Sequence, residues 1–234
     1  MSRAKVVPPF RFAIAEVEVY RGAYPTLKNF SFLKSLGLKT IISLIPEQPT
    51  EDLSDFCVSE NIDHIHKMVE KRKEDVTVSI KDVAEVVSII IRRSKLPVYI
   101  HCLDGSETTG LVICCLRRLQ AWHPECVVNE FCRFSRSAEM SKDEEKFVKS
   151  FKEVEIAEDD PPDWLWKAKL PVEPHPSIKL IKHSEGGVVQ VVRPATQATR
   201  KDTKQVTSSL PLSAAMKRTK KHLAANPSSS SSSS

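Results

Sequence analysis

Short runs of β-branched residues alternate with helix-like runs across residues 10–154, and this alternation restricts the possible folds more than any other feature. The β-type runs are 17–20, 40–45, 62–66 and 97–100. The helix-type runs are 27–36, 50–61, 79–94, 108–122, 124–134 and 141–151. Strands that alternate with helices favour parallel pairing, with helices covering both faces. We therefore predict an α/β fold with a central, mostly parallel sheet flanked by helices.

Local signals support several of these elements. Residues 40–45 are rich in β-branched side chains, as a buried parallel strand requires. Gly37 is a suitable stop for the helix over 27–36, and Ser141 with Glu144 forms a capping-box pattern. Residues 17–20 are expected to be a strand that enters a turn at 21–25.

The composition changes after residue 154. Residues 155–176 are rich in proline and in acidic residues, which predicts a linker or a surface strap. Trp164 and Trp166 in this segment would either dock the strap on the domain or anchor a partner. Residues 177–193 could pair as a hairpin around Ser-Glu-Gly-Gly. Residues 194–234 are basic and serine-rich, and we expect them to be a disordered tail.

The net charge of +5 comes from the C-terminal quarter of the chain. Residues 176–234 hold 10 Lys and Arg but only 2 Asp and Glu, whereas residues 1–175 hold 25 and 28. A charge run in the tail is the single argument for nucleic-acid binding, which we do not expect. The basic segment 217–221 is either a nuclear import signal or merely a solubilising stretch.

Apolar runs are too short for a bilayer span, and residues 1–10 lack the apolar stretch of a secretory signal. We therefore expect a cytoplasmic protein, with nuclear entry depending on the tail, and no membrane partner. The six cysteines contain no CxxC pair, and in a reducing compartment we expect buried thiols rather than disulfides.

Residues 97–110 combine a short strand, a tight loop and the start of a helix. They read Pro-Val-Tyr-Ile-His-Cys-Leu-Asp-Gly-Ser-Glu-Thr-Thr-Gly. Loop amides and a helix N-terminus aimed at one point make an anion site. A cysteine there would have its thiolate stabilised and could attack a phosphoryl group. In parallel α/β folds this is also the end of the sheet where ligands bind.

This stretch resembles the signature loop of the cysteine-dependent protein tyrosine phosphatase superfamily, His-Cys-x5-Arg-Ser/Thr-Gly. Residues 20–25, Tyr-Arg-Gly-Ala-Tyr-Pro, are similar to the entry motif of the plant-and-fungal atypical dual-specificity phosphatases. Residues 30–44 and 116–122 also resemble that family, so the likeness covers about residues 10–152. It implies a dual-specificity-phosphatase-like fold and supports an activity less directly.

Five loop residues match the pattern. The resemblance implies that Cys102 is the nucleophile, that His101 orients the loop from below and that Thr109 stabilises the departing thiolate. Gly105 and Gly110 match as well. Leu103 and Ser106 are further positions of the predicted phosphate loop.

The arginine of the pattern is missing, because position 108 is Thr108. Arginine would hold two phosphate oxygens with a planar charged fork, whereas threonine offers one neutral hydroxyl. The loss of one preorganised donor costs about 3–4 kcal/mol, roughly a thousandfold in rate. Asp104 and Glu107 add negative charge where relatives tend to have basic residues. These departures predict a degenerate, pseudophosphatase-like member.

A general acid is the other requirement of the reaction. The resemblance places it about thirty residues before the cysteine, where Glu70 is the best candidate and Glu74 and Asp75 are alternatives. Arg21 is expected to support the loop backbone. His64 and His66 share one face of a strand but lack a clear third ligand, so no metal site and no cofactor are predicted.

Two functions from different classes remain open. The leading hypothesis is a pseudophosphatase that acts as a regulatory or binding module, and the resemblance implies another phosphatase-like protein as its partner. The alternative is an active phosphatase that uses Cys102 on phosphotyrosine proteins or inositol pyrophosphates. Whether a phosphorylated ligand binds is left open by the sequence.

Overall fold

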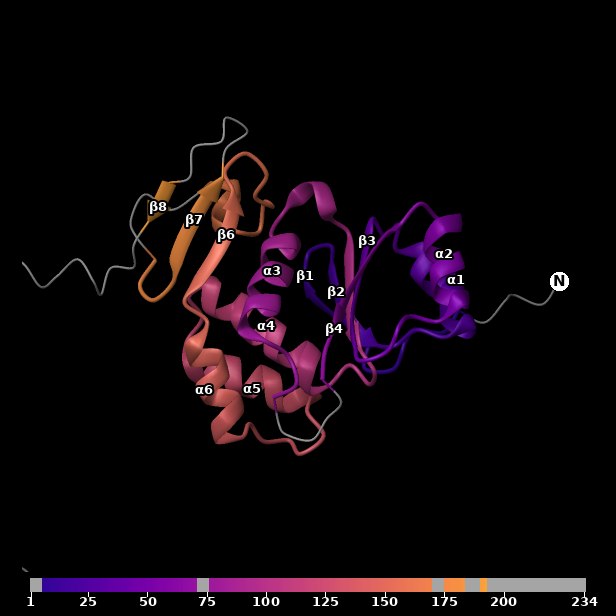
Figure 1. Ribbon diagram of the computed structural model, residues 1–234, viewed down its shortest axis with the longest axis horizontal. Coiled ribbons are helices and arrows are strands. Elements are labelled where there is room, and N and C mark those ends of the chain that lie inside the picture. Colours follow the sequence, from indigo (N-terminus) through magenta and orange to yellow (C-terminus); the bar gives the residue numbers. More distant parts are fainter. Residues whose placement is uncertain (1–5, 71–75, 170–174, 184–189, 193–234) are drawn as a thin grey trace, which may run out of the picture. The chain divides into compact units, whose positions relative to one another are not determined.

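A computed structural model describes residues 6–70, 76–169, 175–183 and 190–192 of the chain (Figure 1). Its centre is a five-stranded sheet with the order β1-β2-β5-β3-β4. β2, β5, β3 and β4 are parallel, and only β1 at the edge runs antiparallel, to β2. The strands are β1 (Ala13–Glu16), β2 (Val19–Ala23), β3 (Thr40–Ile45), β4 (Asp63–Met68) and β5 (Val98–Cys102). The predicted α/β fold with a mostly parallel sheet is confirmed.

Six α-helices in the described residues cover the two faces of the sheet. In Figure 1, α1 and α2 lie on one side, and α3 to α6 lie on the other. The helices are α1 (Leu27–Ser35), α2 (Glu51–Ser59), α3 (Ile80–Ile90), α4 (Glu107–Leu119), α5 (Pro124–Phe134) and α6 (Lys142–Ser150). Short 3-10 turns follow at Arg93–Lys95 and Trp166–Ala168. The capping box of Ser141 and Glu144 is present at the start of α6.

Alternating side chains of β5 enter two separate hydrophobic cores. Tyr99 packs with Leu33, Ile41 and Phe56 beneath α1 and α2. Its neighbours Val98 and Ile100 enter the larger core with residues of α3, α4 and α5. A strand buried on both faces reads as a continuous apolar run, which is why 97–100 could be recognised as a strand.

The expected strand at 17–20 and the expected turn at 21–25 are wrong in their boundaries. Residues 17–18 form the turn between β1 and β2, and Glu18 adopts a left-handed conformation with φ 63°. Arg21 and Gly22 continue β2 and pair with Ile100 and His101 of β5. Pairing with a central strand extends β2 through residues whose types favoured a turn.

The described residues after 154 pack on the same body. β6 (Glu153–Ala157) pairs in parallel with β7 (Lys179–His183), and β7 pairs antiparallel with β8 (Gln190–Val192). Val154 and Leu180 join the larger core, and β6 lies next to α3 (Figure 1). β6 was not predicted, because its partner strand begins more than twenty residues later. The predicted tail over 194–234 lies outside the described residues.

The two tryptophans of the strap are half-buried. Trp164 and Trp166 pack against the larger core, and Leu165 between them is fully buried. Arg93 also binds this segment, through the Pro161 carbonyl and the Asp163 carboxylate. The contacts support docking of the strap on the domain rather than a free partner anchor.

No helix in the described residues is both long and apolar enough to cross a membrane. All six cysteines are free. Cys57, Cys102, Cys114 and Cys115 are buried as expected, whereas Cys126 is exposed.

Candidate functional site

Cys102 is the last residue of β5 and lies at the carboxyl end of the central parallel strands. α4 begins at Glu107, so the loop between strand and helix has only four residues. Its first residue, Leu103, is exposed, and the Leu103 carbonyl accepts a hydrogen bond from the Tyr24 amide at 3.2 Å. The loop therefore lies where the sequence predicted, but it is shorter than expected, because β5 extends through Cys102 and α4 begins at Glu107.

His101 anchors the loop from beneath. The Nδ1 atom lies 3.3 Å from the Cys102 carbonyl oxygen, and Nε2 lies 2.8 Å from the Ser43 hydroxyl. A carbonyl can only accept, so Nδ1 carries the proton and Nε2 accepts from Ser43. Ser43 is in turn 2.8 Å from Nε2 of His64, which completes a buried chain. Burial drives the pKa of His101 down to about 3, so the ring is neutral.

Arg21 supports the loop from the neighbouring strand, as expected. Its Nη2 donates to the Gly105 carbonyl at 3.0 Å and to the Ser106 carbonyl at 3.4 Å. The guanidinium also stacks on the Phe134 ring, 4.0 Å from the centroid. Burial lowers the pKa of Arg21 to about 10, which leaves it charged at neutral pH. This cation contacts the backbone of the loop and so shapes it from below.

Two glycines allow close approach around the loop. Gly105 has φ +74°, and a Cβ there would lie 2.5 Å from the backbone of Gly22. A Cβ on Gly110 would lie 2.9 Å from the Phe131 ring, so α4 packs tightly on α5 at this point. The two glycines are thus required by the packing of the loop and its helix.

Two hydroxyl groups are buried at the loop and the first turn of α4. The Ser106 and Thr109 hydroxyls have no hydrogen-bond partner among the described residues. Thr109 is fully buried, at the position that the resemblance assigns to thiolate stabilisation. An unpaired buried hydroxyl is costly, so its retention fits a site in which a charge or ligand could use it.

Thr108 occupies the position of the missing arginine and lines the cleft. Its hydroxyl is 3.1 Å from the Thr77 hydroxyl, so its polar atom is engaged with a neighbouring segment. Glu107, the first residue of α4, is buried and accepts a hydrogen bond from the Arg136 amide at 3.2 Å. Neither side chain offers a cation to a phosphate.

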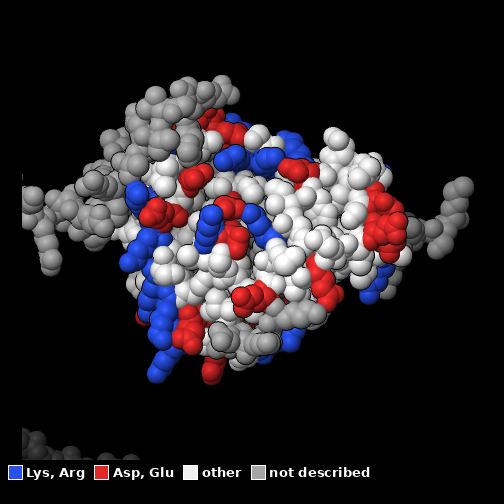
Figure 2. Space-filling view, in the orientation of Figure 1, with Lys and Arg blue, Asp and Glu red and all other residues white. Residues whose placement is uncertain are grey.

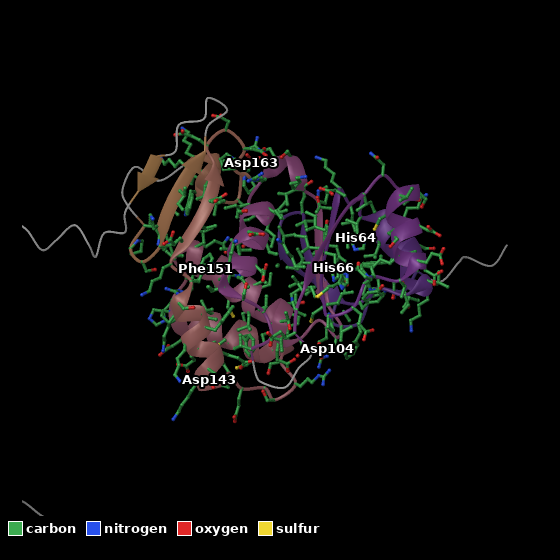
Figure 3. The ribbon with its side chains drawn as sticks, in the orientation of Figure 1. His64, His66, Asp104, Asp143, Phe151 and Asp163 are labelled. Atoms are coloured by element: carbon green, nitrogen blue, oxygen red, sulfur yellow. The ribbon has the colours of Figure 1, made fainter. Side chains whose placement is uncertain are left out.

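Asp104, which is labelled in Figure 3, lies between two arginines in a small charged cluster. Its Oδ2 is 2.6 Å from Nε of Arg136 and 3.5 Å from Nη1 of Arg11. Its Oδ1 accepts from the Ser106 amide at 3.2 Å and from the Cys102 thiol at 3.5 Å. Burial raises the pKa of Asp104, but the hydrogen bonds from Arg136 and Ser106 outweigh it. The net shift of this pKa is downward, so the carboxylate is ionised.

The cysteine opens into a cleft of about 540 Å³. Glu70, the candidate general acid, lines the same cleft, whereas Glu74 and Asp75 lie outside the described residues. Among the described residues that line it, four are acidic and one is basic: Glu47, Glu70, Asp104, Glu107 and Arg136. On the face in Figure 2, acidic and basic side chains stand side by side over the described surface. Among the described residues, the charged side chains that line the cleft are therefore mostly acidic.

Arg136 and Arg11 were missed by sequence reasoning. Arg136 lies between α5 and α6, and Arg11 precedes β1, so neither belongs to a local motif with Cys102. His64 and His66 lie along β4, above Asp104 in Figure 3. In the described residues no group of three or more metal-binding side chains is placed to hold an ion.

A strand–loop–helix junction that carries a cysteine at the end of its strand, on a mostly parallel sheet, is typical of cysteine-based phosphatases. Residues 6–169 match the model of the family described as "Tyrosine phosphatase family". The chain therefore belongs to the tyrosine phosphatase family.

Individual relatives include both protein and inositol phosphatases by name. The "Putative tyrosine-protein phosphatase OCA1" of Debaryomyces hansenii is 34% identical over 170 residues, covering 69% of this chain and 86% of that protein. The Arabidopsis thaliana "Inositol diphosphatase DSP4" is 32% identical over 146 residues, covering 62% and 73%. The solved catalytic domain of the PP-IP phosphatase SIW14 from S. cerevisiae is 28% identical, with a TM-score of 0.58, covering 63% and 89%. This chain is thus a tyrosine or inositol-pyrophosphate phosphatase-like protein.

Proposed function

We propose that this chain is a pseudophosphatase, a phosphatase-like module that binds or regulates a partner instead of hydrolysing phosphate esters. The observation that carries the proposal is the charge of the loop. Thr108 replaces the arginine clamp, and its hydroxyl is engaged by Thr77 at 3.1 Å. The single arginine that lines the cleft among the described residues, Arg136, is already bonded to Asp104.

Electrostatics oppose a phosphorylated substrate at this site. A carboxylate about 6 Å from a phosphate dianion is repelled by roughly 1–3 kcal/mol per pair of unit charges. The charge of Asp104 is offset by its ion pairs with Arg136 and Arg11, but Glu70 and Glu107 also line the cleft with Cys102. Their repulsion adds to the loss of the arginine, which alone costs about 3–4 kcal/mol of transition-state stabilisation. Inositol pyrophosphates carry the highest negative charge of the candidate substrates and are disfavoured most.

The resemblance suggests what such a module would bind. Catalytically degenerate members of the family work beside active ones, so we propose another phosphatase-like protein as the partner.

One observation favours the alternative of an active phosphatase. Cys102 and Glu70 line the same cleft, so a nucleophile and a candidate acid are both available. Such an enzyme would act on phosphotyrosine proteins or inositol pyrophosphates and would have to stabilise the transition state without a loop arginine.

An assay of turnover separates the two functions. Full-length protein and its Cys102→Ser variant are compared on a generic phosphomonoester, a phosphotyrosine peptide and an inositol pyrophosphate. We expect phosphate release at background level for both proteins. Release by the parent that disappears in Cys102→Ser would overturn the proposal and establish the alternative.

A further inference from the structure

The side chain of Asp104 uses the hydrogen-bond donors that a bound oxyanion would otherwise use. Oδ1 accepts from a loop amide, that of Ser106, and from the Cys102 thiol. Oδ2 accepts from the guanidinium of Arg136 at 2.6 Å. An oxyanion in a phosphatase loop is held by loop amides and an arginine and lies directly against the nucleophile, so its ligand position overlaps these three groups.

Arg136 is held in place at two points. Its amide donates to Glu107 Oε1 at 3.2 Å, and its Nε donates to Asp104. The first contact ties the segment between α5 and α6 to the first residue of α4, and the second directs the side chain towards the loop. Asp104 in the loop and Glu107 at the start of α4 therefore both hold Arg136.

Arg11 completes the cluster from the N-terminal side. Its Nη1 is 3.1 Å from the Asp104 carbonyl and 3.5 Å from Oδ2. Two arginines thus share one carboxylate, and the three side chains together carry one positive charge. Removal of the carboxylate would leave two cations at the mouth of the loop.

We propose that Asp104 is a built-in anion that occupies the oxyanion position of the loop, and that Arg136 supplies the cation missing at position 108. The inference rests on the proposed function and gives its physical basis, because a loop that holds its own carboxylate excludes phosphate. The site without Asp104 takes a tetrahedral oxyanion such as inorganic phosphate or vanadate.

A competing interpretation needs only local structure. The contact from Asp104 to the Ser106 amide is the ordinary aspartate turn, and partly exposed ion pairs are worth little. In that case Asp104 contributes negative charge to the cleft without filling a ligand position. Any other carboxylate of the cleft would then have a similar effect on anion binding.

Calorimetry with inorganic phosphate, at low ionic strength, distinguishes these interpretations in the full chain. Asp104→Ala is compared with the parent and with Glu70→Gln, which removes one negative charge from the same cleft but makes no contact with Asp104. We expect Asp104→Ala to bind phosphate at least about tenfold more tightly than the parent, a difference of about 1.4 kcal/mol. Glu70→Gln removes repulsion but frees no hydrogen-bond donor of the loop, so its gain should be clearly smaller than that of Asp104→Ala.

The double variant Asp104→Ala, Arg136→Ala tests the cation. It should lose the gain of Asp104→Ala, whereas Arg136→Lys in the same background should keep part of it as a point charge. Asp104→Asn keeps the oxygen that accepts from Ser106 and removes the charge, so it provides a folded substitute if Asp104→Ala unfolds. Its gain should be smaller than that of Asp104→Ala, because the amide still fills the position.

Three results would overturn the inference. The first is phosphate binding by the parent that is as tight as binding by both Asp104 variants. The second is a gain in phosphate affinity for Glu70→Gln equal to that for Asp104→Ala. The third is an affinity gain in Asp104→Ala that persists when Arg136 is also removed. Inorganic phosphate is not turned over, so the binding result is independent of catalysis. Hydrolysis of a phosphate ester by the parent would overturn the proposed function, but the comparison of phosphate affinities between the variants would still be valid.

Discussion

Gly105→Ala is the substitution that best tests whether the loop keeps its phosphate-cradle shape. The residue has φ +74°, and an added Cβ would lie 2.5 Å from the carbonyl carbon of Gly22 and 2.7 Å from the Ala23 amide. Both neighbours are backbone atoms of β2, which is held in the sheet by pairing with β5. Gly37→Ala is the matched control, because Gly37 has φ +61° and no atom within 4 Å of the added Cβ.

The expected difference in stability follows from this geometry. A left-handed conformation costs a non-glycine residue about 1–2 kcal/mol, and this cost applies at both positions. Carbon atoms in contact prefer about 3.5–4.0 Å, so at Gly105 the loop or β2 must move by about 1 Å. Overpacking of this kind costs roughly 1–3 kcal/mol more. We therefore expect losses of about 1–2 kcal/mol for Gly37→Ala and about 2–5 kcal/mol for Gly105→Ala.

Denaturant unfolding measures both free energies, provided that the slopes of the transitions agree with that of the parent. A larger loss for Gly105→Ala shows that the loop is pressed against β2 in solution. Equal losses of unfolding free energy for the two variants would refute the reasoning, because backbone strain alone would then account for both. The loop would in that case be free to move away from the strand.

Three further predictions concern charge, pH and the tail. Thr108→Arg should improve vanadate binding slightly. The triple change Asp104→Arg, Glu107→His, Thr108→Arg should improve it more, because the carboxylates of Asp104 and Glu107 would otherwise pair with the new arginine. Equal vanadate affinity of the parent and the triple variant in calorimetry would show that the loop no longer has the geometry of a phosphate loop. The pKa of His101 is about 3 in the fold against 6.5 for the free side chain, so the unfolded chain binds more protons and stability falls as pH drops below 6.5. The loss of stability is up to about 1.4 kcal/mol per pH unit for one group. Between pH 7 and 5, the free energy of unfolding of His101→Asn should therefore depend less on pH than that of the parent. Removal of residues 194–234 should leave the melting temperature nearly unchanged, and a large drop would show that the tail packs on the domain.

Local patterns predicted most elements correctly because helix periodicity and caps depend on neighbouring residues. The helix-type run 79–94, which contains α3, and the capping box at Ser141 are examples, since each is specified within a few positions. The strand before Cys102 was also recognisable, because both of its faces are buried and its sequence is continuously apolar. The junction that carries the cysteine is therefore recognisable from the sequence alone.

Long-range pairing was not predictable in the same way. β6 is stabilised by β7, and nothing in the five residues of β6 indicates a partner that begins at Lys179. Glu18, in the turn between β1 and β2, has φ 63°, although no glycine or asparagine in the turn indicates a left-handed residue. The residue types around Arg21 favoured a turn, yet pairing with β5 keeps them extended. Tertiary contacts decide each of these features, so residue types alone gave the wrong boundary.

The candidate site shows the same division between local and distant information. Cys102, Thr108 and the loop carboxylates were readable from one short motif. Arg136 was not, because it reaches the loop from the segment between α5 and α6 and is recognised only by its contact with Asp104.

Shape and charge of this loop are controlled by different residues, so one can be lost while the other persists. The shape depends on backbone contacts: Gly105 against β2, Arg21 on the two loop carbonyls, and His101 on the Cys102 carbonyl. None of these contacts involves the side chains of Asp104 or Thr108. The charge depends on those side chains, which project into the cleft from an already fixed backbone. A phosphatase loop could therefore exchange its oxyanion for an internal carboxylate at little cost to the fold, and the proposed loss of phosphate binding and hydrolysis would leave the domain folded.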